Sequence, residues 1–82
     1  MEPNKTITFG ELIFRLRKAN MLVQEELAHN CKFSRKYMSN LELDKTKPNY
    51  ERTVTLAKNL NVKPSELFHK LGEMADRENG IK

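Results

Sequence analysis

The chain has 82 residues, of which 38% are hydrophobic and 32% charged, and its formal net charge is +4. A chain of this length forms one domain with a small core, leaves little room for an enzyme pocket, and often gains buried surface by dimerising. No stretch is apolar enough to lie in or cross a bilayer, so the basic balance favours nucleic acid over membrane as a partner, although many small domains reach this charge without one.

Cysteine and histidine usage argues against disulfides, metals and catalysis. The single cysteine, Cys31, excludes an internal disulfide and suits a reducing cytoplasm. His29 and His69 are far apart in the sequence, so their spacing is not that of metal ligands. The scattered glycines form no phosphate-binding loop. The N-terminal segment shows no export signal. We therefore expect a cytoplasmic protein that is not an enzyme and needs no metal or cofactor.

The apolar spacing predicts five short helices and no strand, so we expect an all-α domain over residues 8–71. Residues 1–7 are polar and predict a flexible arm. Residues 72–82 lose the apolar pattern and predict a frayed or disordered tail. Thr8 can cap a first helix over residues 9–20. The core stripe of that helix consists of Phe9, Ile13 and Leu16.

Two further apolar residues of the first helix, Leu12 and Phe14, flank its core stripe. They make this helix more apolar all round than a simple surface helix. We expect one of the terminal segments to cover them, and a contact with another chain is the alternative.

The chain is organised around residues 24–42. Apolar residues split this stretch into two short helices joined by a turn at residues 30–33, which is a helix-turn-helix. The second helix begins at Ser34, whose hydroxyl can accept from amide groups of the first turn. At about 100° per residue, its apolar and polar side chains fall on opposite sides. The outward side carries Arg35, Lys36, Ser39 and Asn40.

These outward side chains suit the edges of base pairs. Arg and Lys donate to guanine O6 and N7, Asn pairs with adenine N6 and N7, and Ser serves either. We therefore interpret the second helix as a reader of the major groove. The helix alone leaves a solvated surface face open as the alternative.

Two further helices follow a loop after Glu42. Pro48 supports the loop, because the residue before a proline is biased away from helical angles. Asn49 can cap a fourth helix over residues 50–60. Pro64 stands at the first position of a last helix. The core face of this last helix consists of Leu67, Phe68 and Leu71.

With the helices placed, a wider pattern is visible between Phe9 and Phe68. Its elements are Gly10, Ile13, Leu16-Arg17, Gln24-Glu25-Glu26-Leu27-Ala28, Ser34-Arg35, Ser39-Asn40-Leu41-Glu42, Lys45, Pro48, Leu56-Ala57, Leu60, Val62 and Pro64-Ser65-Glu66-Leu67-Phe68. At these spacings the combination resembles the Cro and lambda-repressor-like family of bacterial and phage helix-turn-helix proteins. The resemblance implies a five-helix domain that binds double-stranded operator DNA as a symmetric dimer, with residues 34–43 in the major groove.

The resemblance also implies roles for individual positions. The base-reading positions are Arg35, Lys36, Ser39 and Asn40. The positions that meet the DNA backbone are Gln24, Ser34, Lys45, Lys47 and Asn49. Arg17 and Glu42 match a pair that in the family forms a salt bridge and holds the reading helix at a fixed angle. Tyr37 either packs its ring at the edge of the core or reaches a phosphate through its hydroxyl.

Three positions depart from the family's pattern and are expected to lower stability. Val23 stands where Ser or Thr usually caps the second helix, which costs about 1 kcal/mol. Lys32 stands where the turn usually has a left-handed glycine, which costs about 1 to 2 kcal/mol. Asp44 replaces a frequent glycine more mildly, because Asp tolerates the left-handed region.

The function implied is that of a small stand-alone transcription regulator, a repressor or controller, that binds a palindromic operator as a homodimer. The predicted dimer surface on the last two helices consists of Thr53, Leu56, Leu60, Phe68 and Leu71. The alternative is an antitoxin-type module of the same family, which binds a partner protein through Leu12 and Phe14 or through the C-terminal tail.

Overall fold

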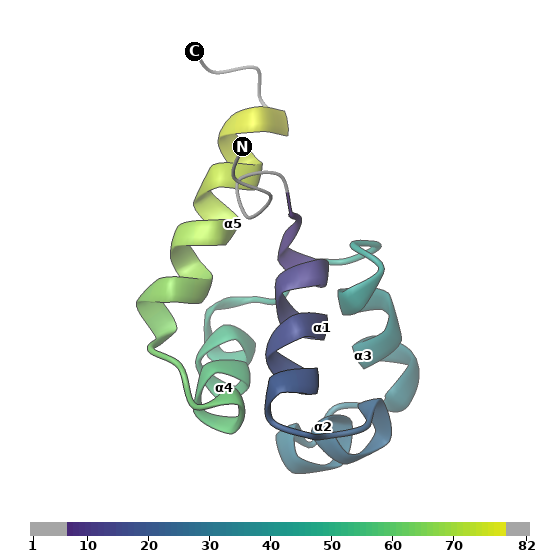
Figure 1. The fold of residues 1–82 in the computed structure, drawn as a ribbon. Helices are drawn as coiled ribbons and strands as arrows, with labels where there is room; N and C mark the ends of the chain where they lie inside the picture. Colours follow the sequence, from purple (N-terminus) through teal and green to yellow (C-terminus); the bar gives the residue numbers. More distant parts are fainter. Residues whose placement is uncertain (1–6, 79–82) are drawn as a thin grey trace.

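The computed structural model describes residues 7–78, with side chains as far as Asp76, and this part of the chain contains five helices and no strand (Figure 1). The helices are α1 (Phe9–Ala19), α2 (Gln24–Cys31), α3 (Arg35–Glu42), α4 (Tyr50–Leu60) and α5 (Pro64–Glu78). The predicted all-α fold is therefore confirmed. None of these helices has the length and apolar character needed to cross a membrane.

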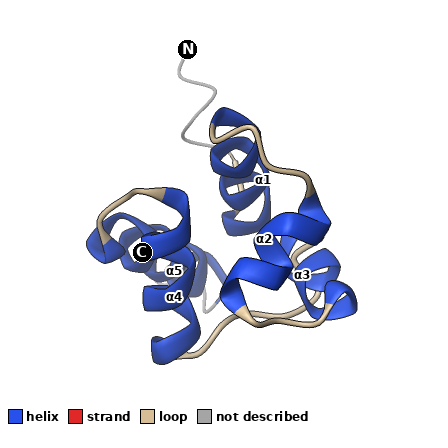
Figure 2. Cartoon of the chain, turned by 90° about the horizontal axis from the view of Figure 1, so that it is seen from below, coloured by secondary structure: helices blue, strands red, loops and turns tan. Residues whose placement is uncertain are grey.

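α1 lies between α3 and α5 (Figure 1). It packs against α3 on one side and α5 on the other, while α2 packs against both α3 and α4 (Figure 1). The view from below places α2 and α3 together at one side of the molecule and α4 and α5 together at the other (Figure 2). The helix-turn-helix formed by α2 and α3 thus lies at one side of the domain, supported by the remaining helices.

The core draws fully buried side chains from every helix. Burying one large apolar side chain contributes about 1.5 to 3 kcal/mol to stability. In α3 the fully buried residues are Met38 and Leu41, which share one side of the helix. The largest fully buried side chains are Phe9, Ile13, Leu27, Met38, Leu41, Leu56, Leu60, Leu67 and Thr53.

The three helix caps expected from the sequence are present. The Thr8 hydroxyl accepts from the Glu11 N–H at 3.1 Å. The Ser34 hydroxyl accepts in the same way in α3, and the Asn49 side-chain oxygen does so in α4. Each cap satisfies a backbone donor that its helix leaves unpaired. The start of each of these helices is therefore fixed by a local interaction.

Val23, at the start of α2, provides no side-chain cap, as its departure from the family's pattern predicts. Part of the loss is offset, because the Glu26 carboxylate accepts from the Val23 N–H at 2.9 Å. Lys32 and Asp44 both adopt left-handed conformations, with φ of 61° and 62°. The backbone strain expected at these two positions is therefore present.

Both ends of the domain differ from the sequence-based expectation. Ile7 is buried and belongs to the fold, and its carbonyl accepts from the Lys70 ammonium at 3.1 Å. α5 does not end at Gly72 but continues to Glu78, because Met74 extends its apolar side and accepts from the Phe9 N–H. The predicted tail is thus wrong for residues 72–78. The rest of the predicted arm and tail lies outside the described residues.

The two apolar residues that flank the stripe of α1 behave differently. Leu12 is partly buried and packs against the core. Phe14 is 43% exposed, and its ring carries the Arg17 guanidinium at 5.2 Å and the Lys18 ammonium at 5.9 Å from its centroid. The expected covering is therefore wrong for Phe14, which remains exposed.

Candidate nucleic-acid interface

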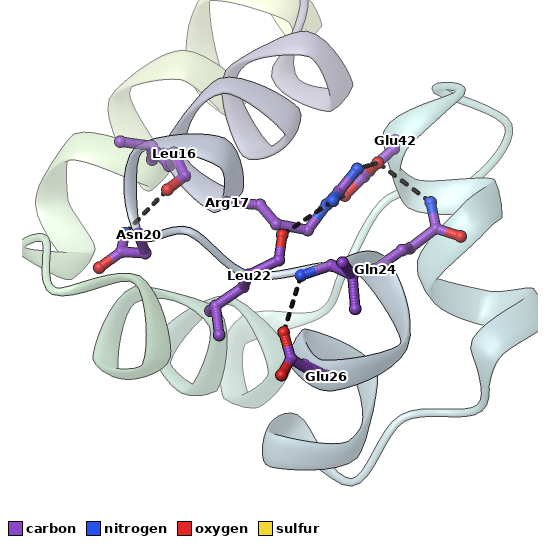
Figure 3. A network of polar contacts seen from close by, with 8 residues as sticks. Leu16, Arg17, Asn20, Leu22, Gln24, Glu26 and Glu42 are labelled. Atoms are coloured by element: carbon purple, nitrogen blue, oxygen red, sulfur yellow. Dashed lines mark hydrogen bonds and ion pairs between the residues drawn. The ribbon is translucent and has the colours of Figure 1, made fainter.

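A buried ion pair fixes α3 to α1. Arg17 Nε donates to Glu42 Oε2 at 2.7 Å and Arg17 Nη2 donates to Glu42 Oε1 at 3.0 Å. The two side chains are only 10% and 7% exposed. Arg17 Nη1 also donates to the Leu22 carbonyl at 3.0 Å, so the same guanidinium holds the turn before α2 (Figure 3). The salt bridge expected between these residues is present, and its two hydrogen bonds attach α3 to α1.

Gln24, expected to contact the DNA backbone, is also part of this network. Its side-chain Nε2 donates to Glu42 Oε1 at 3.0 Å (Figure 3). The side-chain oxygen of Gln24 and its backbone N–H at the first position of α2 are the groups left to meet a phosphate. The network therefore joins three helices through the carboxylate of Glu42.

The N-terminal end of α1 lies directly against the C-terminal end of α3. A Cβ atom placed on Gly10 would lie 2.4 Å from the Glu42 carbonyl oxygen and 2.7 Å from that of Leu41. The Gly10 N–H donates to the carboxylate of Asp44 at 2.8 Å. Asp44 therefore places a negative charge at the positive end of α1. This role of Asp44 was not predicted from the sequence, although an acceptor side chain in place of a frequent glycine was the available clue.

α3 presents one polar side to solvent and buries the other. Arg35 and Lys36 are exposed, and Ser39 and Asn40 are partly exposed. The first turn of α3 contains no acidic residue, so the helix dipole adds to the positive potential there. The structure therefore brings the four predicted base-reading residues together on the open side of α3.

The flanking residues assigned to the DNA backbone lie around this side. Lys45 and Lys47 are exposed in the loop between α3 and α4. Ser34 and Asn49 use a side-chain oxygen for capping, which leaves the hydroxyl proton and the amide N–H groups as donors. These two residues therefore have a structural task besides any contact with DNA.

Tyr37 packs its ring at the edge of the core. The ring meets that of Phe33 edge to face, with 5.1 Å between centroids and 87° between planes. The Tyr37 hydroxyl is buried, and no hydrogen-bond partner for it is present among the described residues. Of the two roles considered for Tyr37, the structure therefore supports packing. The guanidinium of Arg52 lies over the ring, 4.9 Å from its centroid, and this contact was not predicted from the sequence.

Most of the predicted dimer surface is inside the domain. Thr53, Leu56 and Leu60 are at most 1% exposed, because α4 is enclosed between α2 and α5. These three residues cannot meet a second chain, and the prediction is wrong for them. Phe68 and Leu71 are partly buried. Phe68 stacks on Tyr50, which is 71% exposed, with 5.2 Å between ring centroids.

Comparisons with known proteins agree on one family. A family model described as a helix-turn-helix domain matches residues 10–73. The restriction-modification controller protein C.AhdI from Aeromonas hydrophila is similar in structure, with 32% identity and a TM-score of 0.68, over 72% of this chain and 89% of that one. The P22 c2 repressor, solved in complex with synthetic operator 9T, has 32% identity and a TM-score of 0.71, over 76% and 94% of the chains. A search of curated protein sequences found no match.

Fold, site and comparisons together define the class as that of helix-turn-helix DNA-binding transcription regulators. The chain belongs to the Cro and lambda-repressor-like family, as its sequence pattern predicts.

Proposed function

We propose that the chain regulates transcription by binding a palindromic operator as a homodimer, with α3 of each subunit in the major groove of one half-site. The observation that carries this proposal is the arrangement of α3. Four side chains with base-edge chemistry share its open side, while Met38 and Leu41 on the other side are fully buried. The Arg17 and Glu42 ion pair then holds this helix at one angle.

The roles of individual residues follow from their positions. Arg35, Lys36, Ser39 and Asn40 read bases. Gln24, Ser34, Lys45, Lys47 and Asn49 contact the backbone and set the register. The P22 c2 repressor, which was solved with an operator, supports DNA as the partner. The controller protein supports a small stand-alone regulator. The proposal implies a cytoplasmic location, where the chain meets DNA.

We place the dimer contact on the exposed side of α4 and α5. Of the dimer surface predicted from the sequence, Phe68 and Leu71 are the residues that are not fully buried. The exposed ring of Tyr50 stacks on Phe68 and extends this surface. Two-fold symmetry would present two reading helices to half-sites about one helical turn apart. Sedimentation is expected to show a dimer at micromolar concentration, and a monomer there would contradict this part of the proposal.

Selection of bound sites from random duplex DNA tests the function. The expected result is a short palindrome that binds far more tightly than random sequence, with an affinity that falls steeply as salt rises. Weak binding without sequence preference would contradict the proposal. That result would direct the search to a protein partner, as for an antitoxin-type module.

A further inference from the structure

Arg52 links the reading helix to the loop that follows it. Its guanidinium lies over the ring of Tyr37 on α3, 4.9 Å from the centroid. Its backbone N–H donates at 2.8 Å to the side chain of Asn49, the N-terminal cap of α4. Tyr37 and Asn40 are three residues apart and are therefore neighbours on the surface of α3. Arg52 thus contacts Asn49 directly and Tyr37, a neighbour of Asn40 on α3, and the proposed function assigns both Asn40 and Asn49 to DNA.

Among residues 7–78 the charge of Arg52 has no carboxylate partner, and its contact is with the ring of Tyr37. The side chain is exposed, and within residues 7–78 its guanidinium forms no ion pair and donates no hydrogen bond. Arg17, by contrast, directs its donors to Glu42 and Leu22. Arg52 is therefore a cation in a defined position whose hydrogen-bonding capacity is unused.

The contact with Tyr37 orients this cation. Stacking on an aromatic ring occupies the guanidinium plane and leaves the N–H groups at its edge available. Two N–H groups on one edge match two oxygens of a phosphate. Because the ring already restricts the Arg52 side chain, less conformational freedom is lost when a ligand binds. The geometry therefore suits a phosphate at this place.

We propose that Arg52 contacts a phosphate of the DNA backbone and that Tyr37 is the residue that positions it. This inference rests on the proposed function, because the phosphate belongs to the half-site read by α3. The contact would add to the affinity for all sequences alike, since phosphates carry no base identity. It would also help to fix α3 in the groove from the α4 side.

The test compares Arg52→Met with Lys58→Met in the full chain. Both variants remove one exposed cation from α4, but Lys58 is in its last turn, away from Asn49. Affinity for the selected duplex and for random duplex is measured across a range of salt concentrations. Arg52→Met is expected to bind both duplexes about tenfold less tightly. Its salt slope is expected to fall by about 0.9 per subunit, whereas Lys58→Met keeps the wild-type slope.

Arg52→Lys separates a phosphate contact from a purely structural role. Arg52→Lys keeps the positive charge, so the salt slope of its DNA affinity is expected to equal that of the wild type even if the stacked geometry is lost. All variants are measured at a temperature at which circular dichroism shows them folded. A wild-type slope in Arg52→Met, or an equal loss in Lys58→Met, would overturn the assignment and leave the role of α3 intact. A wild-type chain that binds no DNA would instead overturn the proposed function, and this inference with it.

The positioning role of Tyr37 is tested by a double-mutant cycle. Tyr37→Phe keeps the ring and is expected to bind DNA like the wild type. Tyr37→Leu removes the stacking surface and is expected to weaken binding, but the loss should largely disappear when Arg52 is already Met. Fully additive losses would show that Tyr37 does not act through Arg52.

Discussion

The carboxylate of Asp44 accepts a hydrogen bond from the backbone N–H of Gly10 at 2.8 Å, which ties the end of α3 to the beginning of α1. The contact requires close approach of the two helices, and the absence of a side chain on Gly10 allows it. Together with the Arg17 and Glu42 pair, this contact gives α3 two separate attachments to α1. The reading helix is therefore attached to α1 twice at its C-terminal end.

Gly10→Ala is expected to destabilise the protein by about 1 to 3 kcal/mol, because its Cβ would meet backbone carbonyls that cannot move aside. Urea denaturation measures the loss. Gly72→Ala is the matched control, since nothing lies within 4 Å of a Cβ at that position in α5. The control is expected to gain about 0.5 to 1 kcal/mol. Equal effects of the two substitutions would contradict the close packing of α1 on α3.

Arg17→Met is expected to cost about 3 to 5 kcal/mol, because it leaves the Glu42 carboxylate buried without its cation. The double variant Arg17→Met with Glu42→Leu should recover much of this stability, since no isolated charge remains buried. Thermal and urea denaturation measure both variants. A double variant no more stable than the single one would show that the cost does not come from the stranded charge.

Lys32→Gly is expected to stabilise the protein by about 1 kcal/mol, because the left-handed backbone at this position penalises any residue with a Cβ. The same change at Lys58, in the last turn of α4, is the control and should destabilise the protein, because glycine disfavours a helical backbone. Calorimetry compares the melting temperatures. Loss of stability in Lys32→Gly would contradict the strain described for the turn.

The thiol of Cys31 predicts a pH dependence of stability. Burial raises its pKa from 9.0 to about 11, against a smaller opposite effect of a hydrogen bond with Asn59. The unfolded chain therefore loses this proton at lower pH than the folded one. The contribution of the buried thiol to the free energy of unfolding is complete below pH 9 and is lost as the pH rises to about 11. Urea midpoints of the wild type and Cys31→Ala should converge over this window. A constant difference would refute the raised pKa.

The sequence predicted those features of the fold that depend on neighbouring residues. The caps at Thr8, Ser34 and Asn49 each act within one helical turn, and the open side of α3 follows from helical periodicity alone. The error at Leu56 arose because α4 is covered on two sides, by α2 and α5, and a local pattern does not show how much of a helix is enclosed.

Contacts between distant segments escaped prediction for the same reason. The ring of Tyr37 on α3 and the guanidinium of Arg52 on α4 come together only in the folded chain, because the two residues belong to different helices. The continuation of α5 depends on Met74 reaching the start of α1, although the preceding Gly72 disfavours a helix locally. The Arg17 and Glu42 pair was predicted through the family resemblance, since nothing in the local sequence brings these two residues together.

The central claim, that α3 reads bases, is tested most directly with Asn40→Ala on single-base variants of the selected operator. The account predicts that the variant binds the operator about 1 to 3 kcal/mol less tightly and loses its preference at one base pair in each half-site. Its affinity for random DNA should not change, and Lys45→Ala should weaken binding to every duplex alike. An equal loss on operator and random DNA in Asn40→Ala would contradict base reading by α3.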